Sequence, residues 1–336
     1  MGGASLGLVN AGFVIYPYTC AGVADRDLFD RIVAIAETAE HSGFDSLWVG
    51  DHLYAQQTAD LTEPFLEAYT VLAGLAVRTQ HVRLGTLVSP VTFRNPALLA
   101  KIVTTLDVMS KGRPILGVGA GWNEAEHQGY GIRFPPTSER MDRMNEFVQI
   151  CRAMFDSGTA SFRGTYYSVS NVFNYPRPVQ ERIPILVGGG GERRTLRIVA
   201  EHADACNITG SLTQVRHKLG VLERHATEAG RDPGEITKTA LKVIIVRDTP
   251  NEALRASIEA RSVMGMDERA FAGYAIVGDP DQVYEYVMSF LSAGLDGILC
   301  IPANPFALAP EEVVAAGEVF ARAGLIKRGG TTGAMR

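Results

Sequence analysis

The chain has 336 residues, of which 46% are hydrophobic and 21% are charged, and its net charge is −5. This length accommodates two domains or one large α/β barrel, and the composition excludes disorder, collagen and coiled coil as descriptions of the whole chain. The acidic balance does not favour a duplex nucleic acid or an anionic membrane surface as a partner.

The cysteines and the N-terminal segment bear on the cellular compartment. Cys20, Cys151, Cys206 and Cys300 are far apart and form no CxxC pair. This spacing argues against a zinc ribbon or a disulfide framework and predicts a reducing, cytoplasmic location. Residues 1–24 carry no charge and lack a basic leader, so they predict a buried first strand rather than a signal peptide or a membrane span.

Apolar runs and helical patterns alternate along the whole chain. The eight runs expected to form buried parallel strands are Leu6–Ile15, Phe44–Val49, Val82–Val88, Ile115–Val118, Ile185–Val187, Ala203–Ile208, Leu241–Val246 and Leu295–Ile301. Helical periodicity follows at Arg26–His41, Pro64–Thr79, Asn95–Met109, Ser138–Phe155, Arg193–Glu201, Leu212–Ala229, Asn251–Met264 and Glu311–Ala323, with a further helix at Asp281–Ala293 inside the seventh connection. Eight strand–helix units over more than 250 residues predict a (β/α)8 TIM barrel in one domain of residues 1–326, with a doubly wound sheet as the alternative.

Two connections are longer than the others and are predicted to be insertions. Residues 158–184, after the fourth helix, contain three prolines and the aromatic residues Tyr166, Tyr167 and Phe173, which indicates a hairpin or a lid. Residues 265–280, in the seventh connection, show no clear periodicity and are predicted to be irregular. The basic, glycine-rich residues 327–336 are predicted to form a disordered tail.

In a barrel of this kind the C-terminal ends of the strands and the loops after them build the active site. Asp51 and His52 follow the second predicted strand, and Ser89 follows the third. The loop after the fourth strand contains Gly119, Gly121, Trp122 and Asn123. Histidine is the side chain best suited to exchange a proton near neutral pH, so His52 is the candidate catalytic residue. The alternative is a capped loop in which His52 only satisfies backbone groups.

Four consecutive glycines, Gly188, Gly189, Gly190 and Gly191, follow the fifth strand and are predicted to open a helix that contains Arg193 and Arg194. Backbone amides at such a corner and the helix N-terminus favour an anion, so the run predicts a phosphate site. A flexible turn with solvated arginines is the alternative. No GxxxxGK[ST] motif is present, so a nucleoside triphosphate is not indicated.

The glycines at positions 117, 119 and 121 are weak evidence for a dinucleotide fold, because Pro135 and Pro136 intervene before the next strong helix. We interpret these small residues as clearing space for a flat ring at the barrel mouth.

Metal and hydrolase chemistry have little support. The seven histidines form no HxH or HExxH pattern, the neighbours Glu126 and His127 are expected on a loop, and no GxSxG motif occurs.

The chain resembles the bacterial luciferase-like superfamily, and within it the oxidoreductases that use the deazaflavin coenzyme F420. Four segments carry the resemblance across residues 6–323. They are the Asp51-His52 loop, the sequence LGTLV at 84–88 with FRNP at 93–96, the sequence GVGAGW at 117–122 with Glu126, and the sequence YPRPVQ at 175–180, which leads into PILV at 184–187, the glycine run and residues 195–207.

The resemblance implies an eight-stranded barrel with a deazaflavin or flavin ring over its C-terminal mouth. It implies that the Asp51-His52 loop meets the edge of the ring. It also implies a non-prolyl cis peptide, Leu87–Val88, whose bulge supports the back of the ring. The cofactor phosphate would lie on the glycine run, near Arg193, and homodimers are usual.

The chain departs from the sugar-phosphate dehydrogenase branch, where a catalytic glutamate stands in place of Trp122. That substrate is therefore not expected, and Glu126 is expected to be a structural member of its loop.

We predict an F420-dependent oxidoreductase acting on a small organic substrate. The alternatives are an FMN-dependent monooxygenase and a non-catalytic flavin- or deazaflavin-binding protein. Only the deazaflavin carries an acidic glutamyl tail, which Arg193, Arg194 and Arg197 could meet.

Overall fold

The computed structural model describes residues 8–15, 22–54, 62–303 and 309–326. Eight parallel strands form a closed ring in which each strand pairs with the next and the last pairs with the first. In ring order they are β1 (Ala11–Ile15), β2 (Ser46–Val49), β3 (Arg83–Thr86), β5 (Pro114–Gly119), β8 (Ile185–Gly188), β9 (Ala205–Ile208), β10 (Thr237–Val246) and β12 (Gly297–Pro302). The predicted barrel is confirmed, because a doubly wound sheet would have two open edges.

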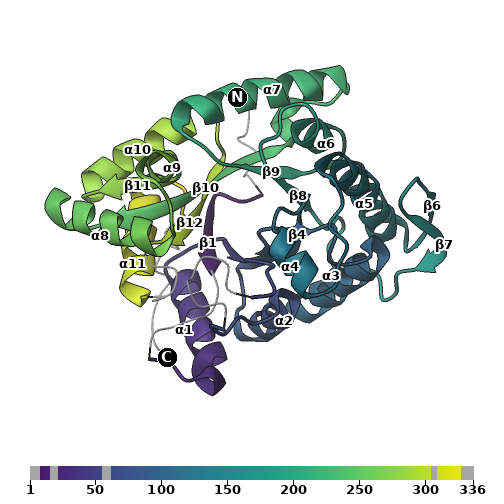
Figure 1. Ribbon diagram of the computed structural model, residues 1–336, viewed down its shortest axis with the longest axis horizontal. Coiled ribbons are helices and arrows are strands. Elements are labelled where there is room, and N and C mark those ends of the chain that lie inside the picture. Colours follow the sequence, from purple (N-terminus) through teal and green to yellow (C-terminus); the bar gives the residue numbers. More distant parts are fainter. Residues whose placement is uncertain (1–7, 16–21, 55–61, 304–308, 327–336) are drawn as a thin grey trace, which may run out of the picture.

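Helices surround the ring in Figure 1 and cover its outer face. They are α1 (Leu28–His41), α2 (Ala68–Arg78), α3 (Pro96–Ser110), α5 (Thr137–Ser157), α6 (Thr195–His202), α7 (Leu212–Glu228), α8 (Pro250–Val263), α10 (Pro280–Ser292) and α11 (Pro310–Arg322). One apolar cluster lies between the helices and the strands, and a second, which includes Trp48, Ile115 and Leu299, fills the barrel interior. The barrel is therefore a packed core, and a ligand must bind at its end.

Local capping explains where several helices begin. Asn95 accepts hydrogen bonds from the first amides of α3, and Pro96 follows it at a position where no amide donor is needed. Ser211, Thr249 and Asp279 form capping boxes at α7, α8 and α10, each with a Gln or Glu three residues later. These caps place the helix starts at the ends of the preceding strands, where the site is expected.

Several predicted boundaries were wrong. Helix α6 begins at Thr195, so Arg193 and Arg194 lie in the turn before it. Glu126 lies on a short helix, α4 (Glu124–Gly129), rather than on a loop, because the Asn123 side chain caps it. Residues 265–280 are not irregular: they form α9 (Glu268–Tyr274) and β11 (Ala275–Gly278), which pairs with the end of β10. Residues 6–7 of the first predicted strand and the predicted tail at 327–336 lie outside the described residues.

The predicted hairpin in residues 158–184 is confirmed. Strands β6 (Thr159–Arg163) and β7 (Ser168–Phe173) pair antiparallel, and the Glu146 carboxylate on α5 accepts hydrogen bonds from three backbone amides of their connecting turn. Figure 1 shows this hairpin beside α5 at the edge of the molecule, away from the barrel axis. The expectation of a lid over the mouth is therefore not met.

Lys242 on β10 is buried against the outer helices. Its ammonium donates hydrogen bonds to the carbonyl oxygens of Gly210 (2.5 Å) and Gly273 (3.0 Å) and lies 4.2 Å from the ring centre of Phe290. No carboxylate pairs with it within the described residues. Burial lowers the pKa of Lys242 to about 8, because the charged form loses hydration.

This pKa predicts a specific pH dependence of stability. Between about pH 8 and the pKa of an unfolded lysine near 10.4, the unfolded chain holds a proton that the folded chain has released. The free energy of unfolding of the wild type should therefore rise with pH relative to that of Lys242→Met across this window. Urea unfolding of both proteins at several pH values measures the difference. A difference that stays constant from pH 8 to 10 would contradict the assignment.

Candidate active site at the barrel mouth

The wall of the mouth bulges after β3. The peptide Leu87–Val88 is cis, as the resemblance implied, and the chain then resumes pairing with β5 through β4 (Ser89–Pro90). Leu87 is buried, whereas Val88 is half-buried. The bulge therefore brings the Val88 side chain to the mouth.

The glycines of the neighbouring strands make room for this bulge. A Cβ atom on Gly119 would lie 2.6 Å from Cγ2 of Val88, and one on Gly188 would lie 2.8 Å from its Cγ1. A Cβ atom on Gly117 would meet the carbonyl oxygen of Thr86 at 1.9 Å. The Val88 side chain fills the space at Gly119 and Gly188, and the Thr86 carbonyl fills that at Gly117, so the interpretation that Gly117 and Gly119 clear room for a flat ring is corrected. A ring would lie against Val88 instead.

A buried polar network lies under the loop that follows β2. The Asp51 carboxylate, which is fully buried, accepts hydrogen bonds from Arg94 at 2.6 and 3.2 Å and from the Ser89 hydroxyl at 2.6 Å. Arg94 also pairs with Glu67, and the Tyr69 hydroxyl is 2.9 Å from that of Ser89. Burial disfavours the guanidinium charge, but the paired Asp51 carboxylate holds the pKa of Arg94 above its ordinary value. The network is therefore a paired, charged anchor for the loop.

This network determines what the predicted residues present to the mouth. Both carboxylate oxygens of Asp51 and the hydroxyl of Ser89 are engaged below the surface. Any contact of these two residues with a bound ring would come from their backbone atoms. Of the Asp51-His52 pair, only His52 offers its side chain to the mouth.

The His52 imidazole is held by a carboxylate from another element. Its Nδ1 lies 2.9 Å from Oε2 of Glu126 on α4, and Oε1 of the same carboxylate accepts the Leu53 amide at 2.6 Å. Glu126 is 1% exposed, whereas the His52 side chain is 13% exposed. In the neutral imidazole, the Nδ1–H group donates a hydrogen bond to Glu126. Nε2 is then a hydrogen-bond acceptor without a partner in the described part of the chain.

Aromatic side chains flank His52. The ring of Trp122 lies 5.6 Å from the imidazole and that of Phe65 lies 6.3 Å from it, both edge to face. Trp122 is 65% exposed, so a large apolar surface stands open beside the imidazole. Asn123 is buried, and its Oδ1 accepts the Glu126 amide while its Nδ2 has no partner in the described residues. Gly121, with φ +79°, makes the turn that leads to Trp122.

The glycine run forms a corner at the end of β8. The Gly189 amide donates to the carbonyl oxygen of Asn207, and the φ of Gly189 is +123°, which suits only glycine. A Cβ atom on Gly190 would lie 2.5 Å from Nζ of Lys218, so that ammonium covers the corner from α7. Arg193 is exposed beside it. Sequence reasoning missed Lys218, because it stands in an ordinary amphipathic helix with no local signal.

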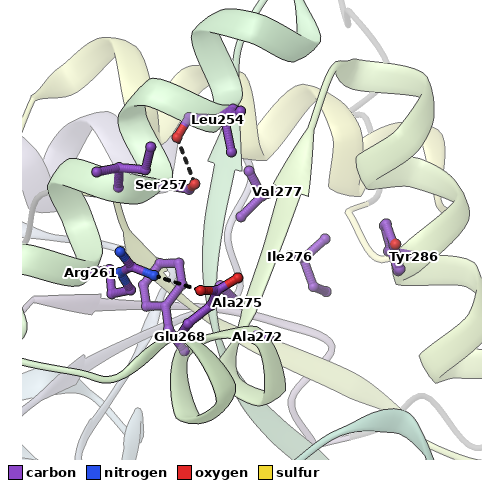
Figure 2. Close-up of a pocket in the computed structure, with 11 residues that line it drawn as sticks. Leu254, Ser257, Arg261, Glu268, Ala272, Ala275, Ile276, Val277 and Tyr286 are labelled. Carbon is purple, nitrogen blue, oxygen red and sulfur yellow. Dashed lines mark hydrogen bonds and ion pairs between the residues drawn. The ribbon is translucent and has the colours of Figure 1, made fainter.

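An apolar groove of about 450 Å³ lies elsewhere, between α8, β11 and α10 (Figure 2). Its charged groups, Arg261 and Glu268, form an ion pair of 3.4 Å with each other. It is lined by apolar side chains such as Leu254, Ile258 and Tyr286. Nothing in it suits proton or hydride chemistry, so the barrel mouth is the better candidate.

The described residues contain no group of three or more His, Cys, Asp or Glu side chains arranged to hold a metal ion. His127 is a satisfied core histidine there, with Nδ1 2.6 Å from the carbonyl oxygen of Asn123 and Nε2 2.7 Å from the Thr92 hydroxyl. Across the same part of the chain, none of the helices is long and apolar enough to cross a membrane.

The fold and the mouth define a (β/α)8 barrel with a ligand site at the C-terminal ends of its strands. A family model described as luciferase-like monooxygenase matches residues 13–297. The chain therefore belongs to the luciferase-like monooxygenase family.

Several relatives have names that specify a cofactor. An F420-dependent glucose-6-phosphate dehydrogenase from Amycolatopsis mediterranei is 27% identical over 80% of this chain and 87% of its own length. One from Kineococcus radiotolerans is 32% identical over 67% of this chain and 66% of its own length. A pyrimidine monooxygenase from Allorhizobium ampelinum is 29% identical over 69% of this chain and 63% of its own length.

Solved structures confirm the fold. The F420-dependent tetrahydromethanopterin reductase from Methanopyrus kandleri superposes with a TM-score of 0.75 at 20% identity, covering 92% of this chain and 97% of that one. The EDTA monooxygenase from Chelativorans superposes with a TM-score of 0.81 at 16% identity, covering 96% of each chain.

The buried pair under the loop makes a testable prediction. In Arg94→Met, Asp51 is left as an uncompensated buried carboxylate, so the free energy of unfolding should fall by about 3–5 kcal/mol. The double variant Asp51→Asn/Arg94→Met removes that charge and should recover part of the loss. Urea unfolding of the wild type and both variants measures these values. Equal stability of the wild type and Arg94→Met would contradict the role of the pair.

Proposed function

We propose that this protein is an oxidoreductase that transfers a hydride between the deazaflavin coenzyme F420 and a small organic substrate. The F420-dependent names of relatives at 27% and 32% identity support this proposal. The observation that carries it is the geometry of His52. Glu126 holds Nδ1, and Nε2 has no partner among the described residues at a mouth bounded by the Val88 bulge and the glycine corner.

The residues at the mouth fit a tricyclic ring with an anionic stem. Val88, raised by the cis peptide at Leu87, would support the back of the ring, and Gly119 and Gly188 allow that position. His52 would meet its edge, with Trp122 alongside. The glycine corner and Arg193 would hold the phosphate. Asp51, Ser89, Gly121 and Asn123 would act by shaping the loops that carry these groups.

The bound cofactor would supply or accept the hydride, and the protein would supply orientation and proton transfer. In the oxidising direction, the neutral His52 would take a proton from a substrate hydroxyl at Nε2. In the reducing direction, the protonated imidazole would return that proton as negative charge develops on oxygen. The Glu126 carboxylate, hydrogen-bonded at Nδ1, would fix the tautomer and stabilise the imidazolium in both directions.

An FMN-dependent monooxygenase is the second candidate, because monooxygenases are among the relatives and the structural neighbours. For the substrate, the exposed ring of Trp122 beside His52 favours an apolar surface at this point rather than the phosphate ester of a sugar. Trp122 also stands where the sugar-phosphate branch has its glutamate, which supports a different substrate.

We also propose a homodimer in the cytoplasm. Val77 on α2 and Leu98, Val108 and Met109 on α3 are apolar and exposed by 40–67%, and the two helices are neighbours. Such a patch favours association with a second copy. The described cysteines are buried and unpaired, which supports a reducing compartment.

The role of His52 predicts a separation of binding from turnover. His52→Ala should keep F420 affinity within about tenfold and lower turnover by roughly 10²–10⁴-fold, as expected when a general acid–base is lost. Glu126→Gln keeps an oxygen acceptor for Nδ1 but removes the charge, so we expect a smaller loss in turnover. F420 absorbance during oxidation of a panel of small alcohols, with a separate binding titration, provides both readouts. Unchanged turnover in His52→Ala would remove this residue from the mechanism.

The choice of cofactor can be tested without turnover, because the two tryptophans differ in exposure. Trp48 is fully buried in the barrel, whereas Trp122 is exposed at the mouth. F420 binding should quench the Trp122 emission at concentrations at least about tenfold below those needed for FMN. This ratio corresponds to a difference in binding free energy of about 1.4 kcal/mol. Trp122→Phe should abolish this signal, with binding then followed by calorimetry. Tight FMN binding without F420 binding would reverse the assignment.

A further inference from the structure

Helix α9, in the seventh connection, lies against the loop that follows β9. A Cβ atom on Gly273, in the last turn of α9, would lie 3.7 Å from the Ser211 amide nitrogen of that loop. Phe271 of α9 belongs to the apolar cluster of the barrel interior, which also contains Leu87 at the start of the bulge after β3. The helix therefore lies over the end of the barrel that carries the mouth.

A cleft of about 390 Å³ opens between the two segments. Its lining includes Thr209 and Gly210 on one side and Asp267, Arg269, Gly273 and Tyr274 on the other. Tyr274 also packs against the interior cluster, as Val88 does. The cleft therefore adjoins the place proposed for the ring, and the position of α9 determines its width.

The Lys242 ammonium joins the two sides of this cleft from the buried side. It donates one hydrogen bond to the carbonyl oxygen of Gly210 and another to that of Gly273, and both glycines line the cleft. A hydrogen bond from an ammonium is stronger than one from a neutral amine. The hold between the two segments therefore depends on this side chain and on its charge.

The burial of Lys242 lowers stability, so the reason for a lysine here must lie elsewhere. Lys242 is 1% exposed, and burial lowers its pKa to about 8, so the folded protein holds the proton less tightly than the unfolded chain does. A methionine of similar length would avoid this cost. It has no donor, however, for the carbonyl oxygens of Gly210 and Gly273. The two bonds across the cleft are what the lysine adds.

The groups that face Lys242 do not determine its charge, because burial is the only cause of its lowered pKa. The ring of Phe290 on α10 contacts the ammonium, and the residue in register on β12 is Cys300, whose thiol burial keeps neutral by raising its pKa. Tyr274 at the end of α9 is half-buried. The charged residues of the contacting segments are exposed, namely Asp267, Glu268 and Arg269 of α9 and Asp281 and Glu285 of α10. Lys218 of α7 bonds to the Thr209 carbonyl instead.

We propose that Lys242 is a positioning residue for the substrate, because its ammonium holds α9 against the loop after β9 and so fixes the width of the cleft beside the ring. Loss of its proton in alkaline solution weakens both bonds and loosens α9. Lys242 takes no part in the proton transfer at His52. Its consequence for the substrate rests on the proposed function, whereas its hold on α9 does not.

Hydrogen exchange of the α9 amides tests this hold without cofactor or turnover. In the wild type, protection of residues 268–274, corrected for intrinsic exchange, should fall about three- to tenfold between pH 7 and pH 9, as charge-assisted bonds become neutral ones. Lys242→Met should show the low protection already at pH 7 and no further fall. Lys242→Arg keeps its charge throughout and should stay protected at both pH values. Equal protection of the wild type and Lys242→Met at pH 7, or the same fall with pH in both, would overturn the proposal.

A matched control uses the same strand. Lys238→Met removes a lysine of β10 that pairs with Asp296, and α9 should stay as protected in this variant as in the wild type. Loss of α9 protection in Lys238→Met would show that any lysine of this strand has the effect, which contradicts a specific role of Lys242. Thermal unfolding verifies that each variant folds. The wild type and Lys242→Met decide the outcome even if Lys242→Arg does not fold.

Kinetics test the consequence for the substrate. For the alcohols that the wild type oxidises with F420, Lys242→Met should raise KM about three- to tenfold and change kcat by less than about twofold, because the cleft widens while His52 stays in place. A fall in kcat at unchanged KM would contradict the positioning role. If the wild type oxidises no alcohol and binds no F420, the proposed function fails, and the exchange data still decide whether Lys242 holds α9.

Discussion

The Glu126 carboxylate is the contact on which the site depends. It is buried on α4, and it accepts hydrogen bonds from Nδ1 of His52 and from the backbone amide of Leu53, both in the loop after β2. One side chain thereby joins the loops of two strands that are not neighbours in the ring and fixes the orientation of the imidazole through Nδ1. The Asp51–Arg94 pair anchors the same loop from below. Two buried carboxylates therefore replace the flexibility expected of a loop with a single orientation.

The bulge at Val88 follows β3, which lies between β2 and β5 in the ring, and the glycine corner follows β8, the next strand after β5. Glycine at 119 and 188 is required because the Val88 side chain occupies the space where their Cβ atoms would stand. Beyond them, Lys218 reaches the corner from α7. The mouth thus combines an apolar support at Val88 with a polar imidazole at His52, and a lysine ammonium lies at the neighbouring glycine corner.

The fold could be predicted from the sequence because apolar runs and helical periodicity are local signals, and all eight strands were found. The resemblance supplied the cis peptide and the His52 loop. The partners of these residues could not be found in the same way. Asp51 and Arg94 are 43 positions apart, and Glu126 is 74 positions from His52. Their contacts exist only once the barrel closes. In the sequence, Lys218 looks like any solvent-facing lysine of a helix. Gly119 looks like a residue that makes room for a bound ring, and only the structure shows that Val88 fills this space.

A crystal structure with F420 bound would show whether the ring lies between His52 and Val88. The ring should lie against Val88, with its edge at hydrogen-bonding distance from Nε2 of His52 and its phosphate at the glycine corner. A ring bound away from His52 with its phosphate elsewhere, or density for FMN alone after exposure to both cofactors, would contradict this arrangement.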